Sequence, residues 1–258
     1  MAESIPGYIG QSVPRREDRH LLLGEGAFVA DMQLPGMLHV AIARSQFPHA
    51  TIKGIDLAAA RAAEGVELAI SGADIHGVLP PISGMQVTTP QGWRDRVDTD
   101  ILIPDQPLIP HDKMRFVGEP YALVVAESRY LAEDAVELIE ADFDPLPPVA
   151  GPDAALADGA ALLHDVLGRN IAAILHTTKG DGAKALDTAP HRLKRRFNHH
   201  RYAAMPMECR GVVADYDARR DILTVWSSSQ VVHWVRREVA NALDMPEERV
   251  ICIAPDVG

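Results

Sequence analysis

The chain has 258 residues, of which 47% are hydrophobic and 24% are charged. These proportions are those of an ordinary globular protein with enough apolar material for a core, and the length suits two modest domains. The formal net charge of −11 argues against nucleic acid or an anionic membrane surface as a partner, because both are bound through a basic face.

The cysteine content and the N-terminal residues restrict the class of protein further. The two cysteines, Cys209 and Cys252, are too few to hold an iron–sulfur cluster or a structural zinc within this chain. The first ten residues lack the basic region and apolar run of a signal peptide, and no stretch approaches the roughly 18 apolar residues that cross a bilayer. The sequence therefore predicts a cytoplasmic protein with no membrane insertion.

Short strands around a small helix are predicted in the first part of the chain. Residues 1–17 are polar and are expected to form an extended arm. Strands are predicted at 37–43 and 65–70, and the alanine-rich residues 56–63 between them predict a helix with Asp56 as its N-cap.

A long loop and then a compact strand–helix unit are predicted next. Residues 77–112 are rich in proline, glycine and polar side chains, and loops of that length are usually functional or interface-forming. Residues 121–126 predict a buried strand, and Ser128 is placed to cap a helix that runs to about Glu140. The prolines within 142–148 are expected to end regular structure.

The last third regains periodic patterns after a weakly patterned segment. Residues 150–192 are rich in alanine, glycine and aspartate and are expected to be a linker at the domain boundary. The elements predicted after it are a strand at 192–200, a hairpin of strands at 211–216 and 222–227, an amphipathic helix at 231–243 with Val231, Val232, Val235, Val239 and Leu243 inward, and a final strand at 249–254.

Several familiar kinds of site are not supported by the residues. The two glycines of Gly24-Glu25-Gly26 are not followed by a dinucleotide-binding fingerprint. His199 and His200 are adjacent, so in a strand they would point to opposite faces and could not reach one metal ion. Cys209 is not in a recognisable nucleophile setting.

Gln230 is a stronger candidate for a site residue. It follows three serines at the point where a predicted strand ends and a predicted helix begins. Side chains on such rigid junctions are often directed at ligands. The alternative interpretation is a helix-capping turn that uses the serines and leaves Gln230 without a role.

Three ordered stretches carry a resemblance to a known family. The first contains RRED at 15–18, LLGEGAFVAD at 22–31, Arg44-Ser45 and His49-Ala50. The second is residues 117–149, which begin VGEPYA and end LPPV, and the third is residues 207–258, which contain Met-Glu at the start, WSSSQ at 226–230 and APDVG at the end. In this order and spacing they resemble the molybdopterin-binding large subunits of the xanthine dehydrogenase and aldehyde oxidase family, in particular the branch similar to bacterial carbon monoxide dehydrogenase.

The resemblance implies an α+β fold in two domains. Residues 18–150 would form an α/β hammerhead domain that carries no chemistry. Residues 151–258 would form the first, incomplete part of a mixed α/β molybdopterin-binding domain.

The resemblance also implies roles for two residues. Gln230 matches the glutamine that donates a hydrogen bond to an oxygen ligand of the molybdenum in this family. Gly258 lies in the Pro-Asp-Val-Gly sequence that leads into a glycine-rich segment whose backbone contacts the metal centre and the pterin. A neutral amide suits the first role because it donates a hydrogen bond without adding charge.

The implied cofactor is molybdenum–molybdopterin, expected in its cytosine dinucleotide form. Its dithiolene sulfurs hold the metal, so protein thiolates are not required and the protein supplies orientation and electrostatics. No FAD or iron–sulfur cluster is expected in this chain.

The implied activity is that of an oxidoreductase subunit that hydroxylates an aldehyde, CO or an N-heterocycle, with water as the oxygen donor. The expected partners are the remaining part of the large subunit, which would supply the general-base glutamate, together with an iron–sulfur subunit and an FAD subunit. This chain alone is not expected to bind the cofactor tightly or to turn over.

The alternative function is a non-catalytic, truncated, hammerhead-type interaction protein. A truncated domain is expected to expose the apolar face of the helix at 231–243 and the edge of the strand at 249–254.

Overall fold

The computed structural model describes residues 7–82, 98–101, 104–176 and 179–258. They belong to two compact units: unit 1 comprises Met1–Leu34 and Tyr202–Gly258, and unit 2 comprises Pro35–Arg201. The domain boundaries implied by the resemblance, after residues 17 and 150, stay a prediction. Within the described ranges, no helix is long and apolar enough to cross a membrane.

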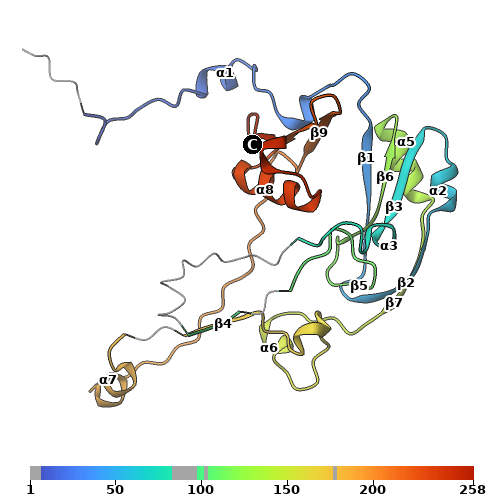
Figure 1. The fold of residues 1–258 in the computed structure, drawn as a ribbon. Coiled ribbons are helices and arrows are strands. Elements are labelled where there is room, and N and C mark those ends of the chain that lie inside the picture. The colour runs from blue at the N-terminus through green and yellow to red at the C-terminus, as the bar shows by residue number, and fades with distance from the viewer. Residues whose placement is uncertain (1–6, 83–97, 102–103, 177–178) are drawn as a thin grey trace, which may run out of the picture. The chain divides into compact units, whose positions relative to one another are not determined.

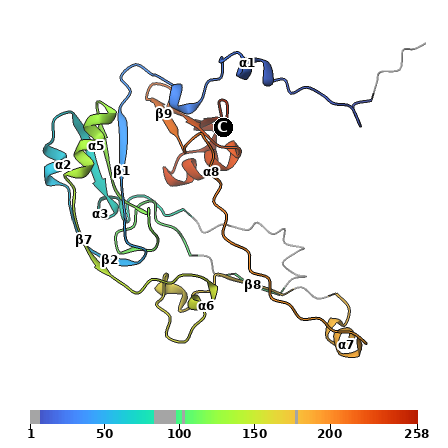
Figure 2. The ribbon, with the colours of Figure 1, turned by 180° about the vertical axis from the view of Figure 1, so that it is seen from behind.

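Unit 2 contains a three-stranded antiparallel sheet with helices on one face. The strands are β1 (His39–Arg44), β6 (Pro120–Ala126) and β3 (Val66–Ser71), in the order β1-β6-β3. Helices α2 (Ala58–Ala62) and α5 (Arg129–Glu137) lie on the same side of this sheet in both views (Figures 1 and 2).

Small side chains form the core between this sheet and its helices. Strand side chains alternate between faces, and the residues of the sheet that turn toward the helices are mostly alanines. Two clusters of buried residues result, one of Ala60, Ala69, Val124 and Ala135 and one of Ala43, Leu57 and Ala122. Alanine on both sides lets the helices approach the sheet closely.

Of the two helix caps predicted in this region, Ser128 is confirmed, whereas the N-cap of α2 is Leu57 and the predicted cap Asp56 lies one residue before it. The Asp56 carboxylate accepts a hydrogen bond of 2.8 Å from the Ala58 N–H, and the Ser128 hydroxyl accepts one of 3.2 Å from the Leu131 N–H. The prediction that α5 reaches about Glu140 is wrong, because the helix ends at Glu137 and Glu140 begins a strand.

A second antiparallel sheet consists of three strands that the sequence patterns do not predict. Its strands are β5 (Lys113–Met114), β2 (Ala50–Asp56) and β7 (Glu140–Pro145), in the order β5-β2-β7. Strands β2 and β7 run side by side from Ala50 opposite Pro145 to Asp56 opposite Glu140 (Figure 2). The prediction that residues 142–148 break regular structure is therefore wrong up to Pro145.

Both predicted irregular segments contain short elements. Within 77–112, residues 83–97 and 102–103 lie outside the described residues, and β4 (Asp98–Ile101) pairs with β8 (Ala173–His176). The other elements that complete unit 2 are α3 (Gly72–Ile75), α6 (Pro152–Ala155), η2 (Asp165–Leu167) and α7 (Gly182–Thr188).

The predicted strand at 192–200 is wrong. These residues are exposed and have no regular secondary structure. Four positive charges lie within Arg192–Arg196, and a strand there would place three of them, Arg192, Lys194 and Arg196, on one face. Solvation of these side chains is favoured instead, and His199 and His200 are exposed in the same segment.

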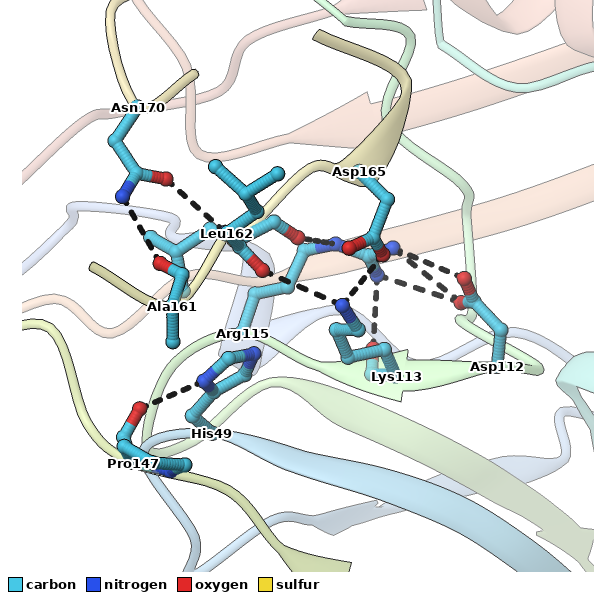
Figure 3. A network of polar contacts seen from close by, with 10 residues as sticks. His49, Asp112, Lys113, Arg115, Pro147, Ala161, Leu162, Asp165 and Asn170 are labelled. Atoms are coloured by element: carbon cyan, nitrogen blue, oxygen red, sulfur yellow. Dashed lines mark hydrogen bonds and ion pairs between the residues drawn. The ribbon is translucent and has the colours of Figure 1, made fainter. Parts of the chain in front are cut away.

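A polar clamp holds residues 161–165 against strand β5. We use this name for the side-chain contacts of Lys113, Arg115 and Asn170, which are shown as sticks in Figure 3. Lys113 Nζ pairs with Asp165 at 2.5 Å and donates to the carbonyl of Leu162 at 3.3 Å. Arg115 Nε donates to the carbonyl of Leu163 at 3.1 Å.

The remaining contacts of the clamp use the rest of the Arg115 guanidinium and an asparagine. Arg115 Nη1 donates to the carbonyl of Lys113 at 2.8 Å, and Nη2 pairs with Asp112 at 3.1 Å. Asn170 accepts the N–H of Leu163 at 3.1 Å and donates to the carbonyl of Ala161 at 2.9 Å. The segment predicted as a linker is therefore fastened by side-chain contacts to backbone groups.

Unit 1 is built on a mixed three-stranded sheet. The strands are β9 (Val212–Asp217), β10 (Ile222–Ser227) and β11 (Val250–Ile253), in the order β11-β10-β9. The predicted hairpin is confirmed as the antiparallel pair β9–β10, and the predicted final strand is β11, which pairs in parallel with β10. Helix α8 (Val232–Ala242) and the short helix η3 (Glu247–Arg249) connect β10 to β11.

The inward face of α8 was placed only in part by its sequence pattern. Ala240 is the buried residue of the helix, and Val232, Val235 and Val239 are half-buried. Val231 and Leu243, predicted inward, are 50% and 44% exposed. The exposure expected for the end strand is also observed, since Ile251 and Ile253 of β11 are exposed and β11 is an edge strand.

Short helices at the other end of the chain complete unit 1. They are α1 (Asp18–Leu22) and η1 (Val29–Asp31), both within the N-terminal segment of this unit. Val29 is buried and lies against Gly211 at the start of β9.

Candidate functional site

Three loops of unit 1 meet at one edge of its sheet. Strands β10 and β11 are parallel, with Trp226 opposite Ile253, so both carboxyl ends lie at the same edge. Strand β9 is antiparallel to β10, with Val212 opposite Ser227, so its amino end lies at this edge too. The carboxyl edge of parallel strands is where α/β sheets place their ligand-binding residues.

Gln230 lies in the loop that leaves β10. The loop is fixed by its serines, because Ser228 Oγ accepts the Gly211 N–H at 2.9 Å and Ser229 Oγ accepts the Val231 N–H at 3.2 Å. Gln230 itself is exposed, and its side chain has no hydrogen-bond partner among the residues that the structure describes. The serines thus fix the loop without capping α8, whose N-cap is Val231, and they leave the amide of Gln230 free for a ligand.

Gly258 lies at the end of the loop that leaves β11, against Glu208. The Gly258 N–H donates a hydrogen bond of 2.7 Å to Glu208 Oε2. A Cβ atom at position 258 would lie 2.6 Å from the Cβ of Glu208, which is closer than real Cβ atoms approach. Glycine is therefore required here by the close approach of the Glu208 side chain.

Glu208 is the residue of this edge that sequence reasoning did not single out. The Met-Glu pair at 207–208 belongs to the resemblance, but nothing in its local pattern indicates a role. The signal lies in the structure: Glu208 Oε1 is buried and has no hydrogen-bond partner among the described residues.

Asp256 connects the β11 loop to the N-terminal segment. Its carboxylate accepts the Ala27 N–H at 2.9 Å and lies 3.0 and 3.1 Å from Nε2 of His20. The Asp256 N–H donates to the carbonyl of Ala27 at 3.1 Å. The hydrogen bond from the Ala27 N–H, followed by that from His20, holds the pKa of Asp256 below its ordinary value.

Substitution of Asp256 by asparagine is expected to loosen residues 20–27. A carboxyl group with a lowered pKa stabilises the folded state above its ordinary titration range, and this contribution is lost as the pH falls through the lowered value. We therefore expect the Ala27 amide to exchange faster with deuterium in Asp256→Asn at neutral pH, and the difference from wild type to shrink in acid. Asp215→Asn, on the exposed side of β9, is the matched control. Equal protection of Ala27 in both variants at neutral pH would contradict the role given to Asp256.

The donors and acceptors at this edge are a neutral amide, backbone groups and one carboxylate. The described residues contain no group of three His, Cys, Asp or Glu side chains that could hold a metal ion. A metal directly ligated by this part of the chain does not fit. A cofactor that brings its own metal ligands fits better, with Gln230 as an unoccupied donor and Glu208 Oε1 as an unoccupied acceptor.

A separate cavity of about 580 Å³ lies within unit 2. It is lined mostly by apolar side chains and prolines, with the stacked rings of His76 and His111, whose centroids are 3.6 Å apart, in its wall. Neither Gln230 nor Gly258 lines it.

Two family models match most of the chain. The a/b hammerhead domain of aldehyde oxidase and xanthine dehydrogenase matches residues 23–147, and the molybdopterin cofactor-binding domain matches residues 163–258. The second match includes both Gln230 and Gly258.

Curated relatives agree with these matches. The chain is 36% identical over 250 residues to the nicotine 6-hydroxylase large subunit of Paenarthrobacter nicotinovorans, which covers 97% of this chain and 29% of that protein. It is 32% identical over 274 residues to the carbon monoxide dehydrogenase large chain of Afipia carboxidovorans, covering 100% of this chain and 31% of that protein.

Solved structures share the fold. Quinoline 2-oxidoreductase from Pseudomonas putida 86 matches with a TM-score of 0.81 and 38% identity, over 96% of this chain and 30% of that one. Carbon monoxide dehydrogenase from Oligotropha carboxidovorans matches with a TM-score of 0.80 and 30% identity, over 96% of this chain and 31% of that one. The chain thus spans less than a third of the length of these relatives.

Proposed function

Because this chain belongs to the xanthine dehydrogenase and aldehyde oxidase family of molybdopterin-binding large subunits, we propose that it supplies the hammerhead domain and the first part of the cofactor site of a molybdenum hydroxylase. Residues 18–150 are assigned to the first part and residues 151–258 to the second. The observation that carries the proposal is that the free amide of Gln230 and the Glu208–Gly258 contact both lie at the carboxyl edge of the unit 1 sheet.

The residues of this chain orient and polarise rather than react. When bound, the molybdenum–molybdopterin cofactor supplies a two-electron oxidation in which water provides the oxygen. Gln230 donates a hydrogen bond to the cofactor from a loop that Ser228 and Ser229 hold in place. Its neutral amide adds no charge beside a charged metal centre. Gly258 offers backbone groups at a point where a side chain does not fit.

The finer parts of the proposal concern the cofactor form, the substrate and the partners. The cofactor is assigned as the cytosine dinucleotide, and the substrate as an aldehyde, CO or an N-heterocycle. The partners are the remaining part of the large subunit, an iron–sulfur subunit and an FAD subunit, and the assembly is placed in the cytoplasm. Support comes from relatives named as subunits of hydroxylases and dehydrogenase complexes. No comparison favours the alternative of a non-catalytic interaction protein.

The test is the native complex isolated through this chain. Molybdenum analysis of the wild-type complex should give about one metal per copy, and Gln230→Ala should lower kcat/KM about 100-fold, as expected for the loss of one pre-oriented donor. The molybdenum content should stay at the wild-type level, because one exposed amide contributes little to retention of the cofactor. Gln33→Ala, an exposed glutamine in the same unit, is the matched control.

Two results would contradict different parts of this proposal. A complex without molybdenum would remove the proposed function. Full molybdenum with unchanged kcat/KM in Gln230→Ala would remove only the role of this residue.

A further inference from the structure

Glu208 connects the two predicted site residues through the start of β9. Its Oε2 accepts the Gly258 N–H at 2.7 Å, which fixes the loop after β11. The next residue, Cys209, presents its carbonyl to the Ser228 hydroxyl at 3.5 Å, and Ser228 also accepts the Gly211 N–H. Ser228 lies two positions before Gln230, so Glu208 and its neighbours join the loop after β11 to the loop after β10.

The second oxygen of the Glu208 carboxylate lacks a hydrogen-bond donor within the described part of the chain. Oε1 is buried and has no donor among the described residues, although the other oxygen is fully engaged. A buried acceptor without a donor costs about as much as a lost hydrogen bond, so such an atom in a ligand-facing loop indicates a missing partner. A carboxylate oxygen accepts but cannot donate while ionised, so the missing partner is an N–H or O–H donor.

We propose that Glu208 is a positioning residue of the cofactor site, whose Oε2 holds the Gly258 backbone and whose Oε1 accepts an N–H or O–H donor of the assembled enzyme. This inference rests on the proposed function. The donor comes either from the cofactor, whose pterin carries N–H groups, or from backbone of the polypeptide that completes the site. In both cases Glu208 orients the loop at Gly258 and does not itself react.

Glutamine at position 208 separates the two oxygens chemically. In Glu208→Gln the amide oxygen still accepts the Gly258 N–H, which directs the NH₂ group to the place of Oε1. A donor would then face the incoming N–H donor. Glu208→Gln should therefore preserve the Gly258 contact and fail only where Oε1 is used, whereas Glu208→Ala should lose both.

The Gly258 contact is tested by deuterium exchange on the full chain before assembly. The peptide containing residues 254–258 should exchange about tenfold faster in Glu208→Ala, because one hydrogen bond to a charged acceptor is lost. Glu208→Gln should stay within about threefold of wild type, since the amide oxygen still accepts that hydrogen bond. Glu248→Gln, an exposed carboxylate on η3, is the control and should not change exchange. Unchanged exchange in Glu208→Ala would overturn the first half of the proposal.

The use of Oε1 is tested in the native complex. Glu208→Gln should retain at least tenfold less molybdenum than wild type after dialysis, and the metal that remains should give an altered electron paramagnetic resonance spectrum. Assembly of Glu208→Gln is then compared with that of wild type in cells that lack the cofactor. If Glu208→Gln assembles less well than wild type there, the donor belongs to the polypeptide backbone. If both assemble equally well, the donor belongs to the pterin. Full molybdenum retention with a wild-type spectrum in Glu208→Gln would overturn the second half.

Failure of the role given to Glu208 can be distinguished from failure of the proposed function. If wild-type complex contains no molybdenum, the proposed function fails and the exchange result on Gly258 still stands or falls by itself. If the wild type is loaded and Glu208→Gln behaves like it, only the role of Glu208 is lost.

Discussion

Replacement of Gly72 by alanine is expected to lower the free energy of unfolding of unit 2 by about 3 kcal/mol or more. Gly72 is buried at the start of α3, and a Cβ atom there would lie 2.1 Å from the carbonyl oxygen of Pro110 and 2.7 Å from that of Ile109. Both are backbone atoms of buried residues, so no side-chain rotation relieves the clash. Urea denaturation followed by circular dichroism measures the loss.

The matched control is another glycine at the start of a helix. Gly182 begins α7, and a Cβ atom there meets nothing within 4 Å. Gly182→Ala should be neutral or slightly stabilising, because alanine loses less conformational entropy on folding than glycine. Similar small effects in both variants would contradict the close approach of Pro110 to Gly72.

Replacement of Arg115 by methionine is expected to lower the free energy of unfolding of unit 2 by about 2–3 kcal/mol. The Arg115 side chain is only 14% exposed, and its loss leaves the carbonyls of Leu163 and Lys113 without donors. The ion pair with Asp112 contributes less, because the Asp112 side chain is 49% exposed and solvent screens it. Urea denaturation gives the total, and proteolysis near residue 163 should report local release of the polar clamp.

An exposed ion pair of unit 2 provides the comparison. Arg129 pairs with Glu133 at 2.7 Å on α5, and both side chains are largely exposed. Arg129→Met should change stability by less than about 0.5 kcal/mol. If Arg115→Met were equally mild, the contacts of the clamp to backbone carbonyls would not be the source of stability.

Elements with local signals could be predicted, and elements that depend on distant partners could not. The hairpin β9–β10 has alternating apolar residues on both sides of a turn, and the cap at Ser128 is a local hydrogen bond. Strands β2 and β7 contain glycine, lysine and several acidic residues, which are poor strand formers. They are strands because they pair with each other across the intervening chain, which no local pattern shows.

The residues of the candidate site also differ in whether a local signal or a distant partner reveals them. Gln230 could be proposed from the sequence because a strand–helix junction is a local feature. Glu208 could not, because its importance depends on the return of Gly258 to its side from 50 residues further along the chain. The strand predicted at 192–200 failed for the converse reason: its alternation is local, but none of the described strands pairs with it.

The division of unit 1 between the two ends of the sequence affects how the chain is made. Residues 7–34 are synthesised long before their partner Asp256, which follows His20 by 236 residues. Unit 2 is complete in sequence well before that point and can fold during synthesis. The N-terminal segment of unit 1 therefore docks only after unit 2 has been synthesised, and it does so by a slow, long-range closure.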